Sequence, residues 1–199
     1  MARQGDELRH PITGERIVWR QVARDTGGAL LQADLFAMPH ASPAAAHVHP
    51  RQEERFEVVA GVLKVSIDGV ETTLGPGDVA VVPPGTPHTW WNVNDAEAHI
   101  VADIRPALRS EMFFETLFGL AADGKTDQRG LPRPLQLATL VTEFSDEVRL
   151  ARPPAFVQRL MFVPLAAVGR LRGYRGWYPQ YSANPINKPS TAARRSSPS

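Results

Sequence analysis

The chain has 199 residues, of which 43% are apolar and 22% charged, the composition of an ordinary soluble globular protein. No run of 18 apolar residues occurs and the charged start of the chain, 1–15, lacks the apolar stretch of a secretory signal, so we expect a cytoplasmic protein without a membrane-spanning helix. The absence of cysteine excludes disulfides and thiolate metal sites, and a net charge of +1 without a recognition motif argues against nucleic-acid binding.

The first 105 residues predict short strands separated by turns. The segments rich in apolar and β-branched residues are 17–23, 30–37, 54–60, 62–67, 70–74, 79–82, 88–93 and 98–104. Asp68-Gly69 stands between two of them and is typical of a tight hairpin. Many short strands separated by Gly and Pro indicate an antiparallel barrel or sandwich, because parallel sheets need long helical connections.

After Pro106 the apolar spacing changes to the helical period. We expect helices over 110–122, which Ser110 can cap, and near 134–148. A third apolar stretch, 156–171, contains Pro164, which is expected to kink it or split it in two. The chain is therefore divided into a β-barrel at 1–106, a helical extension at 107–181 that packs on the barrel or on a partner, and a disordered tail at 182–199.

Two short stretches carry chemistry-bearing residues. His47 and His49 are two apart, which on an extended strand directs both imidazoles to one face. Glu54 follows five residues after His49, far enough for the chain to turn and present a carboxylate to the same point, and Gly61 comes seven residues later. The second stretch contains, in order, Gly77, Pro83, Gly85, His88 and Asn92.

The spacing of these stretches resembles the two signature motifs of the cupin superfamily. The first motif reads H-x-H, four residues, E, six residues, G; the second reads G, five residues, P-x-G, two residues, H, three residues, N. Every spacing is met, and the one departure is Ala41, where the first motif usually opens with glycine. The likeness covers roughly residues 29–105. It implies a mainly β fold, a single cupin jelly-roll β-barrel, to which this chain adds a C-terminal helical segment.

By this likeness the ligands of one divalent metal ion are His47, His49, Glu54 and His88. Such a set without sulfur suits iron, which we favour, or manganese, nickel, copper or zinc, and it leaves coordination positions open, as catalytic sites do. Glu53 competes with Glu54 for the carboxylate role. Strand alternation favours Glu54, because choosing Glu53 would also direct Arg55 and Glu57 into the apolar interior.

Five residues are candidates for the wall of a substrate pocket: Phe36, Phe56, Trp90, Asn92 and Arg105. Alternation places Phe56 on the face of Glu54, and Trp90 and Asn92 on the face of His88. These side chains could equally be barrel core. For Phe36, alternation does not decide which face of the strand points inward. Arg105 could hold a substrate carboxylate, or form a surface ion pair instead.

The resemblance leaves three classes of function open. We favour a metal-dependent enzyme acting on a small organic molecule, most plausibly a non-haem iron(II) oxygenase. The alternatives are a redox-neutral isomerase, cyclase, decarboxylase or lyase, and a non-catalytic small-molecule-binding or sensing protein, since cupin folds host all of these. Cupins are often dimers, so we also expect a homodimer.

The C-terminal part of the chain is basic. From residue 149 to 199 there are nine basic residues and no acid, so the basic part could pack on the acidic body or contact an anionic partner. Within it, 155–178 combines an apolar stretch with arginines and aromatic residues, which is typical of peripheral membrane contact. Packing of the same residues on the barrel or on a partner chain is the alternative that Pro164 favours.

Overall fold

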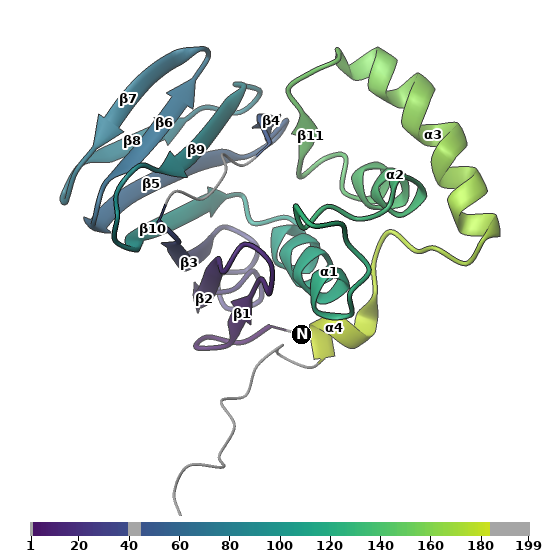
Figure 1. The fold of residues 1–199 in the computed structure, drawn as a ribbon, viewed down its shortest axis with the longest axis horizontal. Coiled ribbons are helices and arrows are strands. Elements are labelled where there is room, and N and C mark those ends of the chain that lie inside the picture. Colours follow the sequence, from purple (N-terminus) through teal and green to yellow (C-terminus); the bar gives the residue numbers. More distant parts are fainter. Residues whose placement is uncertain (1, 40–44, 184–199) are drawn as a thin grey trace, which may run out of the picture.

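The structure, a computed structural model, describes residues 2–39 and 45–183 and contains two antiparallel β-sheets (Figure 1). In spatial order the first sheet consists of β1 (Glu7–Arg9), β2 (Arg16–Gln21), β3 (Leu31–Ala37), β10 (Ala98–Arg105), β5 (Glu53–Ala60) and β8 (Val79–Val82). The second consists of β11 (Arg149–Leu150), β4 (His47–Val48), β9 (His88–Asn92), β6 (Leu63–Ile67) and β7 (Val70–Leu74). The predicted mainly β fold with an added C-terminal helical segment is confirmed.

The hydrophobic core follows from strand alternation. On β3 every second residue is buried, beginning with Leu31, and on β5 the buried residues are Glu54, Phe56 and Val58. Leu63 of β6 contributes from the second sheet, so both sheets bury one face in a common cluster. Glu54, and not Glu53, is therefore on the inward face of β5, as the alternation predicts.

Two turns depend on left-handed backbone conformations. Asp68 and Gly69 have φ values of 50° and 81° and close the β6–β7 hairpin, in which Ile67 pairs with Val70. This confirms the predicted hairpin. Gly61, with φ of 82°, lies against β10, where a Cβ atom would come within 2.8 Å of the Cα atom of Ala98. Glycine is needed there both for its backbone conformation and for its lack of a side chain.

The helices are α1 (Ser110–Ala122), α2 (Pro134–Glu143), α3 (Ala155–Leu171) and α4 (Pro179–Ala183). α1 has the predicted bounds, but Ser110 does not cap it. Its hydroxyl instead accepts a hydrogen bond from the Gln52 side chain, which joins β5 to the helical segment. In Figure 1, α2 lies beside α3, and α4 reaches back to α1. Within the described ranges, no helix has both the length and the apolarity that crossing a bilayer requires.

The structure refines two helix predictions. The second helix ends at Glu143 instead of 148, where the carbonyl oxygen of Glu143 accepts a hydrogen bond from Arg109. α3 runs through Pro164 as one helix, so of the two alternatives, a kink or a split, the split does not occur. The carbonyl of Leu160, which loses its amide partner to the proline, belongs to a residue that is 75% exposed and can bond to water. Residues 184–199 of the predicted tail, and Ala41, lie outside the described residues.

Candidate metal centre

The four predicted ligand residues lie together in the fold. His47 on β4 pairs directly with His88 on β9, His49 follows β4, and Glu54 comes from β5 of the other sheet. One ligand atom from each side chain lies within 4.8 Å of all the others. His47 is half-buried, while the other three are buried. The two sheets therefore meet at a polar cluster inside an otherwise apolar interior.

Each imidazole is held through its Nδ1 atom by a backbone carbonyl. The Nδ1 atoms of His47, His49 and His88 lie 2.9, 2.6 and 3.0 Å from the carbonyl oxygens of three residues, which are Ala45, Glu147 and Thr86 respectively. A carbonyl oxygen can only accept, so Nδ1 carries the hydrogen in each ring and donates it. In the neutral imidazoles, Nε2 is then the atom with the free lone pair, which is the form that a metal requires.

The lone pairs of two of these rings face a carboxylate oxygen. Oε2 of Glu54 lies 2.8 Å from Nε2 of His88 and 3.4 Å from Nε2 of His49. If both rings are neutral, their Nε2 lone pairs face the oxygen of an ionised carboxylate in a buried space. Such a contact between hydrogen-bond acceptors is unfavourable. A proton, on an imidazole or on the carboxyl group, or a metal ion must therefore lie between them.

The pKa values within the cluster reflect the opposing effects of burial and of the neighbouring charges. Burial favours the neutral form of Glu54, but His49 and His88 outweigh it and hold its pKa well below the usual range. Burial also favours the neutral form of His49, but the carboxylate of Glu54 raises the pKa of this imidazole. Burial, followed by the charge of His88, lowers the pKa of His47 to about 4. The carboxylate is thus ionised, and His47 stays neutral at physiological pH.

The residues present fit a divalent metal ion. Three Nε2 atoms and one carboxylate are the nitrogen and oxygen donors that such ions take, and the carbonyl-anchored Nδ1 atoms fix the ring orientation from behind. Within residues 2–39 and 45–183, Nε2 of His49 makes no hydrogen bond, although it is buried. A metal ion would satisfy that atom.

Two of the predicted pocket residues continue from the ligands along their strands. Phe56 is fully buried two residues after Glu54, and Trp90 is partly buried two residues after His88. Their ring centroids are 6.4 Å apart, so they pack against each other across the two sheets. These rings form an apolar layer next to the polar cluster, and their role as a pocket wall stays a prediction.

Phe36 and Arg105 point away from the interior. Phe36 alternates with buried Leu35 and Ala37 on β3 and stacks on His99 of β10, with ring centroids 4.5 Å apart. The strand register places Phe36, which was a candidate for the pocket wall, on the outer face of β3. Arg105 pairs with Asp103 on the outer face of β10, Nη2 to Oδ2 at 2.9 Å. An ion pair was the alternative to substrate binding, and here its carboxylate is buried while the side chain of Arg105 is 42% exposed.

Asn92 is inward but has a structural role. Its amide nitrogen donates to the carbonyl oxygens of Ala37 and Ala96, and its Oδ1 accepts from the amide of Asn94. One amide hydrogen bonds within the turn between β9 and β10, and the other bonds to the end of β3. The prediction that Asn92 contacts substrate is therefore replaced by one in which it secures the strand that carries His88.

The helical segment contributes a contact to the site that was not predicted. The carbonyl that anchors His49 belongs to Glu147, whose buried carboxylate accepts a hydrogen bond from Nε of Arg109 at 3.1 Å. Beside it, β11 pairs with β4. A main-chain carbonyl has no residue signature, so this contact could not be read from the sequence. A buried glutamate within reach of an arginine is the one trace it leaves.

Comparison with known families assigns the region that holds these residues. The family described as "Cupin domain" matches residues 35–103, which include all four candidate ligands. This part of the chain is a cupin domain. The predicted resemblance is confirmed for this region, and the helices α1 to α4 lie outside the match.

Curated relatives extend the similarity beyond the cupin domain. The chain is 30% identical over 155 residues to a protein of Aspergillus niger named "Probable oxidoreductase yanE", covering 69% of this chain and 58% of that protein. It is 29% identical over 155 residues to one of Hypocrea virens named "Probable oxidoreductase virH", covering 71% and 69%. An oxidoreductase of Arthrobotrys oligospora is 29% identical over 153 residues and is covered to 59%. The chain thus spans less than two thirds of the length of the Aspergillus niger and Arthrobotrys oligospora proteins, 58% and 59% respectively.

Solved structures that resemble the chain include an RmlC-like cupin from Shewanella frigidimarina, with a TM-score of 0.46 and 21% identity over 56% of this chain and 93% of that chain. KdgF from a Halomonas species has a TM-score of 0.42 and 20% identity over 47% of this chain and 79% of that chain. The assignment of the cupin domain rests on the sequence match and on the fold itself.

Proposed function

We propose that this protein is a metal-dependent oxidoreductase that acts on a small organic molecule, with iron(II) as its metal and dioxygen as its oxidant. Its ligands would be the imidazoles of His47, His49 and His88 and the carboxylate of Glu54. Relatives that match most of this chain are named oxidoreductases, which favours redox chemistry over the redox-neutral reactions that the cupin fold also supports.

The observation that carries the proposal is the convergence of four donors around one point. Their ligand atoms lie within 4.8 Å of one another, and each of the three rings donates its Nδ1 hydrogen to a backbone carbonyl. Rings held from behind in this way cannot turn away from the centre, so the site is arranged before a metal arrives.

The residues of the chain would each do a separate task. An iron(II) ion would supply the redox chemistry with dioxygen when bound. Glu54 would balance part of the positive charge of the ion, and the lowered pKa of His47 keeps that imidazole neutral at physiological pH. Phe56 and Trp90 provide an apolar surface beside the donors, which would exclude water and hold the apolar part of a substrate.

Metal content tests the ligand set. We expect the purified protein, reconstituted with iron(II) without air, to hold about one equivalent per chain. The variant His47→Ala/His88→Ala is expected to lose it. His99→Ala is the matched control, because His99 also faces a carboxylate, that of Asp34, but on the outer face of the first sheet. Circular dichroism checks folding, and Glu54→Gln offers a second variant that preserves the shape of the site.

The oxidant is tested separately. Nitric oxide, a dioxygen analogue, is expected to give the electron paramagnetic resonance signal of a high-spin iron nitrosyl, because four protein ligands leave room for an added one. A panel of phenols, ketones and carboxylic acids is then supplied in air and under argon. Turnover under argon would identify a redox-neutral enzyme. An iron site that does not bind nitric oxide would contradict the oxygenase proposal.

A further inference from the structure

On the helix α3 most of the large apolar residues are exposed to solvent. Its buried residues are small or polar, namely Gln158, Ala166 and Gly169, and Phe162 is half-buried. At Gly169, α2 and α3 come so close that a Cβ atom would lie 2.9 Å from the carbonyl oxygen of Leu135. The exposed large apolar residues are Phe156, Leu160, Met161, Val163, Leu165, Val168 and Leu171.

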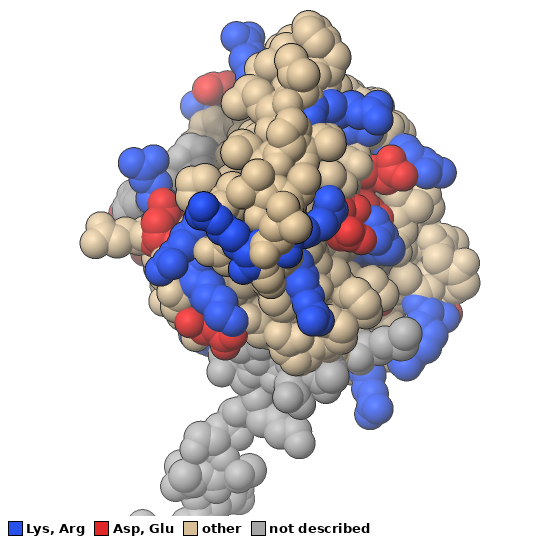
Figure 2. All heavy atoms as spheres, turned by 90° about the vertical axis from the view of Figure 1, so that its right-hand side faces the viewer, with Lys and Arg blue, Asp and Glu red and all other residues tan. Residues whose placement is uncertain are grey.

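The exposed side forms a continuous apolar face. Leu160, Val163 and Leu171 recur at helical spacing, and Leu160 and Leu171 are 75% and 89% exposed. Figure 2 shows this face as a tan ridge, with basic side chains gathered around its lower end. Single exposed leucines are common on protein surfaces. A whole helix face without a charged residue indicates instead a surface that a protein partner or a membrane covers.

In the part of the chain that the structure describes, the basic side chains beside this face form no ion pairs. Within residues 2–39 and 45–183, no ion pair is formed by any of four arginines: Arg159, Arg170, Arg172 and Arg175. All four are exposed. The sequence contains no acid after Glu147, so the positive charge of this part is not balanced locally.

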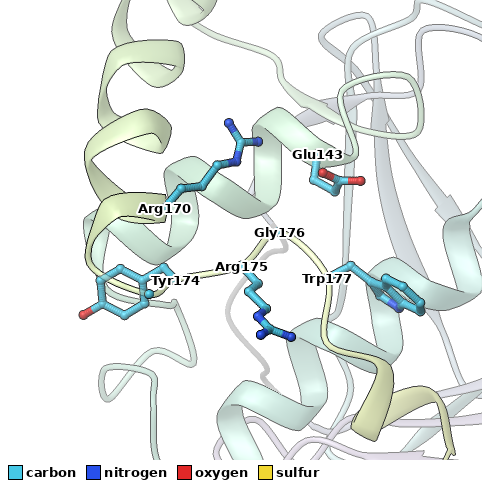
Figure 3. A pocket seen from close by; sticks show the side chains of 7 residues that line it. Glu143, Arg170, Tyr174, Arg175, Gly176 and Trp177 are labelled. Atoms are coloured by element: carbon cyan, nitrogen blue, oxygen red, sulfur yellow. The ribbon is translucent and has the colours of Figure 1, made fainter.

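A pocket opens where α3 ends. It has a volume of about 500 Å³, and Arg170, Tyr174, Arg175 and Trp177 line it (Figure 3). Glu143 also lines it, but its carboxylate is paired with Arg109 at 2.9 Å. In Figure 3 the side chain of Arg170 extends toward Glu143. Guanidinium groups bind phosphate oxygens through paired hydrogen bonds, and tyrosine and tryptophan favour the boundary between water and lipid.

From these observations we propose that α3 and the segment that follows it, 155–178, bind the surface of an anionic lipid membrane. The apolar face enters the boundary between headgroups and acyl chains, and the pocket at the helix end receives a lipid phosphate. The helix lies in the plane of the membrane and does not cross it. This proposal is independent of the proposed metal chemistry, because none of its residues is a candidate ligand.

Charge favours a membrane over a second copy of the chain. A twofold contact with parallel α3 helices would bring the two arginine-rich ends together, where like charges repel. With antiparallel helices each arginine-rich end would lie against a segment of the other copy that contains no acid, so a second copy would leave these arginines unpaired. An anionic lipid surface instead attracts each arginine, by about fivefold in binding per residue. The same charge complementarity explains why the arginines lie beside the apolar face without ion pairs in the described part of the chain.

Vesicle sedimentation of the full chain tests the proposal. The probes are vesicles of phosphatidylcholine alone and of phosphatidylcholine with phosphatidylglycerol at a ratio of about 70:30, at low and high salt. We expect binding to the anionic vesicles that weakens with salt, and little binding to the neutral ones. Leu160→Ser/Leu171→Ser and Arg170→Gln/Arg172→Gln are each expected to reduce binding more than tenfold.

Matched controls are Val70→Ser, which removes an exposed apolar side chain on β7, and Arg129→Gln, which removes an exposed arginine elsewhere. Both should bind as the unchanged protein does. Absence of binding to anionic vesicles overturns the proposal, as does equal binding to both kinds of vesicle. A dimer that Leu160→Ser/Leu171→Ser converts to monomers, without vesicle binding, would assign the face to a second copy instead.

Discussion

At the scale of single residues, the candidate metal centre depends on the charge of Glu54 as well as on its shape. Its carboxylate lies 2.8 Å from Nε2 of His88, and the neighbouring imidazoles hold its pKa well below the usual range. A buried carboxylate in that state is ready to bind a cation without first releasing a proton. Glu53 is half-buried on the opposite face of β5 and does not belong to the cluster of imidazoles around Glu54.

Glu54→Gln is therefore expected to weaken iron(II) or zinc binding by more than about tenfold, since even outer-layer changes around metal sites cost that much. Glutamine keeps the volume and one oxygen but removes the negative charge. The measurement is competition for the metal with a chelator of known affinity. Glu53→Gln is the control and should bind metal normally; a loss in Glu53→Gln in place of Glu54→Gln would reverse the assignment of the ligand.

Glu115 on α1 makes stability depend on pH. It is 4% exposed, its Oε2 has no hydrogen-bond partner among the described residues, and burial raises its pKa to about 7. A raised pKa means that the folded state binds the proton more tightly than the unfolded state does. Its stabilising effect is complete below pH 4.5 and is lost as the pH rises through about 7.

Glu115→Gln should raise the free energy of unfolding at pH 8 by about 2 kcal/mol, because no charge is then left in the interior. The advantage should disappear near pH 4, where the glutamate is protonated in both states. Urea denaturation at the two pH values measures the difference. Asp146→Asn, at a largely exposed carboxylate, is the control, and an equal gain at both pH values would show that packing and not charge is responsible.

At the scale of elements, the first sheet depends on the close contact between Gly61 and β10. A Cβ atom at Gly61 would lie 2.8 Å from the Cα atom of Ala98, and the residue has a φ of 82°. Gly77 has a φ of 89° but no atom within 4 Å of an added Cβ. The two glycines therefore separate the cost of a left-handed conformation from the cost of a collision.

Gly77→Ala is expected to lower the free energy of unfolding by about 1–2 kcal/mol, the cost of the left-handed conformation alone. Gly61→Ala should cost at least about 1 kcal/mol more, because β5 and β10 must also move apart. Chemical denaturation of both variants gives the comparison. Equal losses would mean that the contact with Ala98 relaxes freely.

The whole molecule joins its helical part to the candidate metal centre. The Glu147 carbonyl anchors His49, β11 pairs with β4, and the amide of Ala151 donates to the carbonyl oxygen of Ala46 at 2.9 Å. Opening of this edge would release His47 and His49 from their positions. Binding of a metal at these imidazoles should therefore stabilise the helical segment as well as the barrel.

Hydrogen exchange can detect that coupling. At a free zinc concentration of about 100 times its dissociation constant, amides of residues 149–151 should exchange up to about a hundredfold more slowly than in the metal-free protein. Amides of β7, an edge strand without a candidate ligand, serve as the reference and should change much less. Equal slowing in both places would indicate general stabilisation rather than a local link through β4.

The sequence by itself determined the strands β2, β3 and β5 to β10, the Asp68-Gly69 hairpin and the choice of Glu54 over Glu53, but not β1 or β11. These features depend on local geometry: alternation along one strand and the left-handed residues of one turn. The bounds of α1 also followed from helical spacing. The family match to residues 35–103 agrees with the motif spacing, because the motifs record where turns and inward-facing side chains fall along those strands.

Only the tertiary structure decided which side of β3 Phe36 occupies, that the amide of Asn92 is used by backbone carbonyls, and that Glu147 reaches His49. Each depends on contacts between segments far apart in the chain, and alternation fixes two faces without saying which one is inward. The exposure of the apolar side of α3 is of the same kind, since a helical pattern shows that a face exists but not what packs against it.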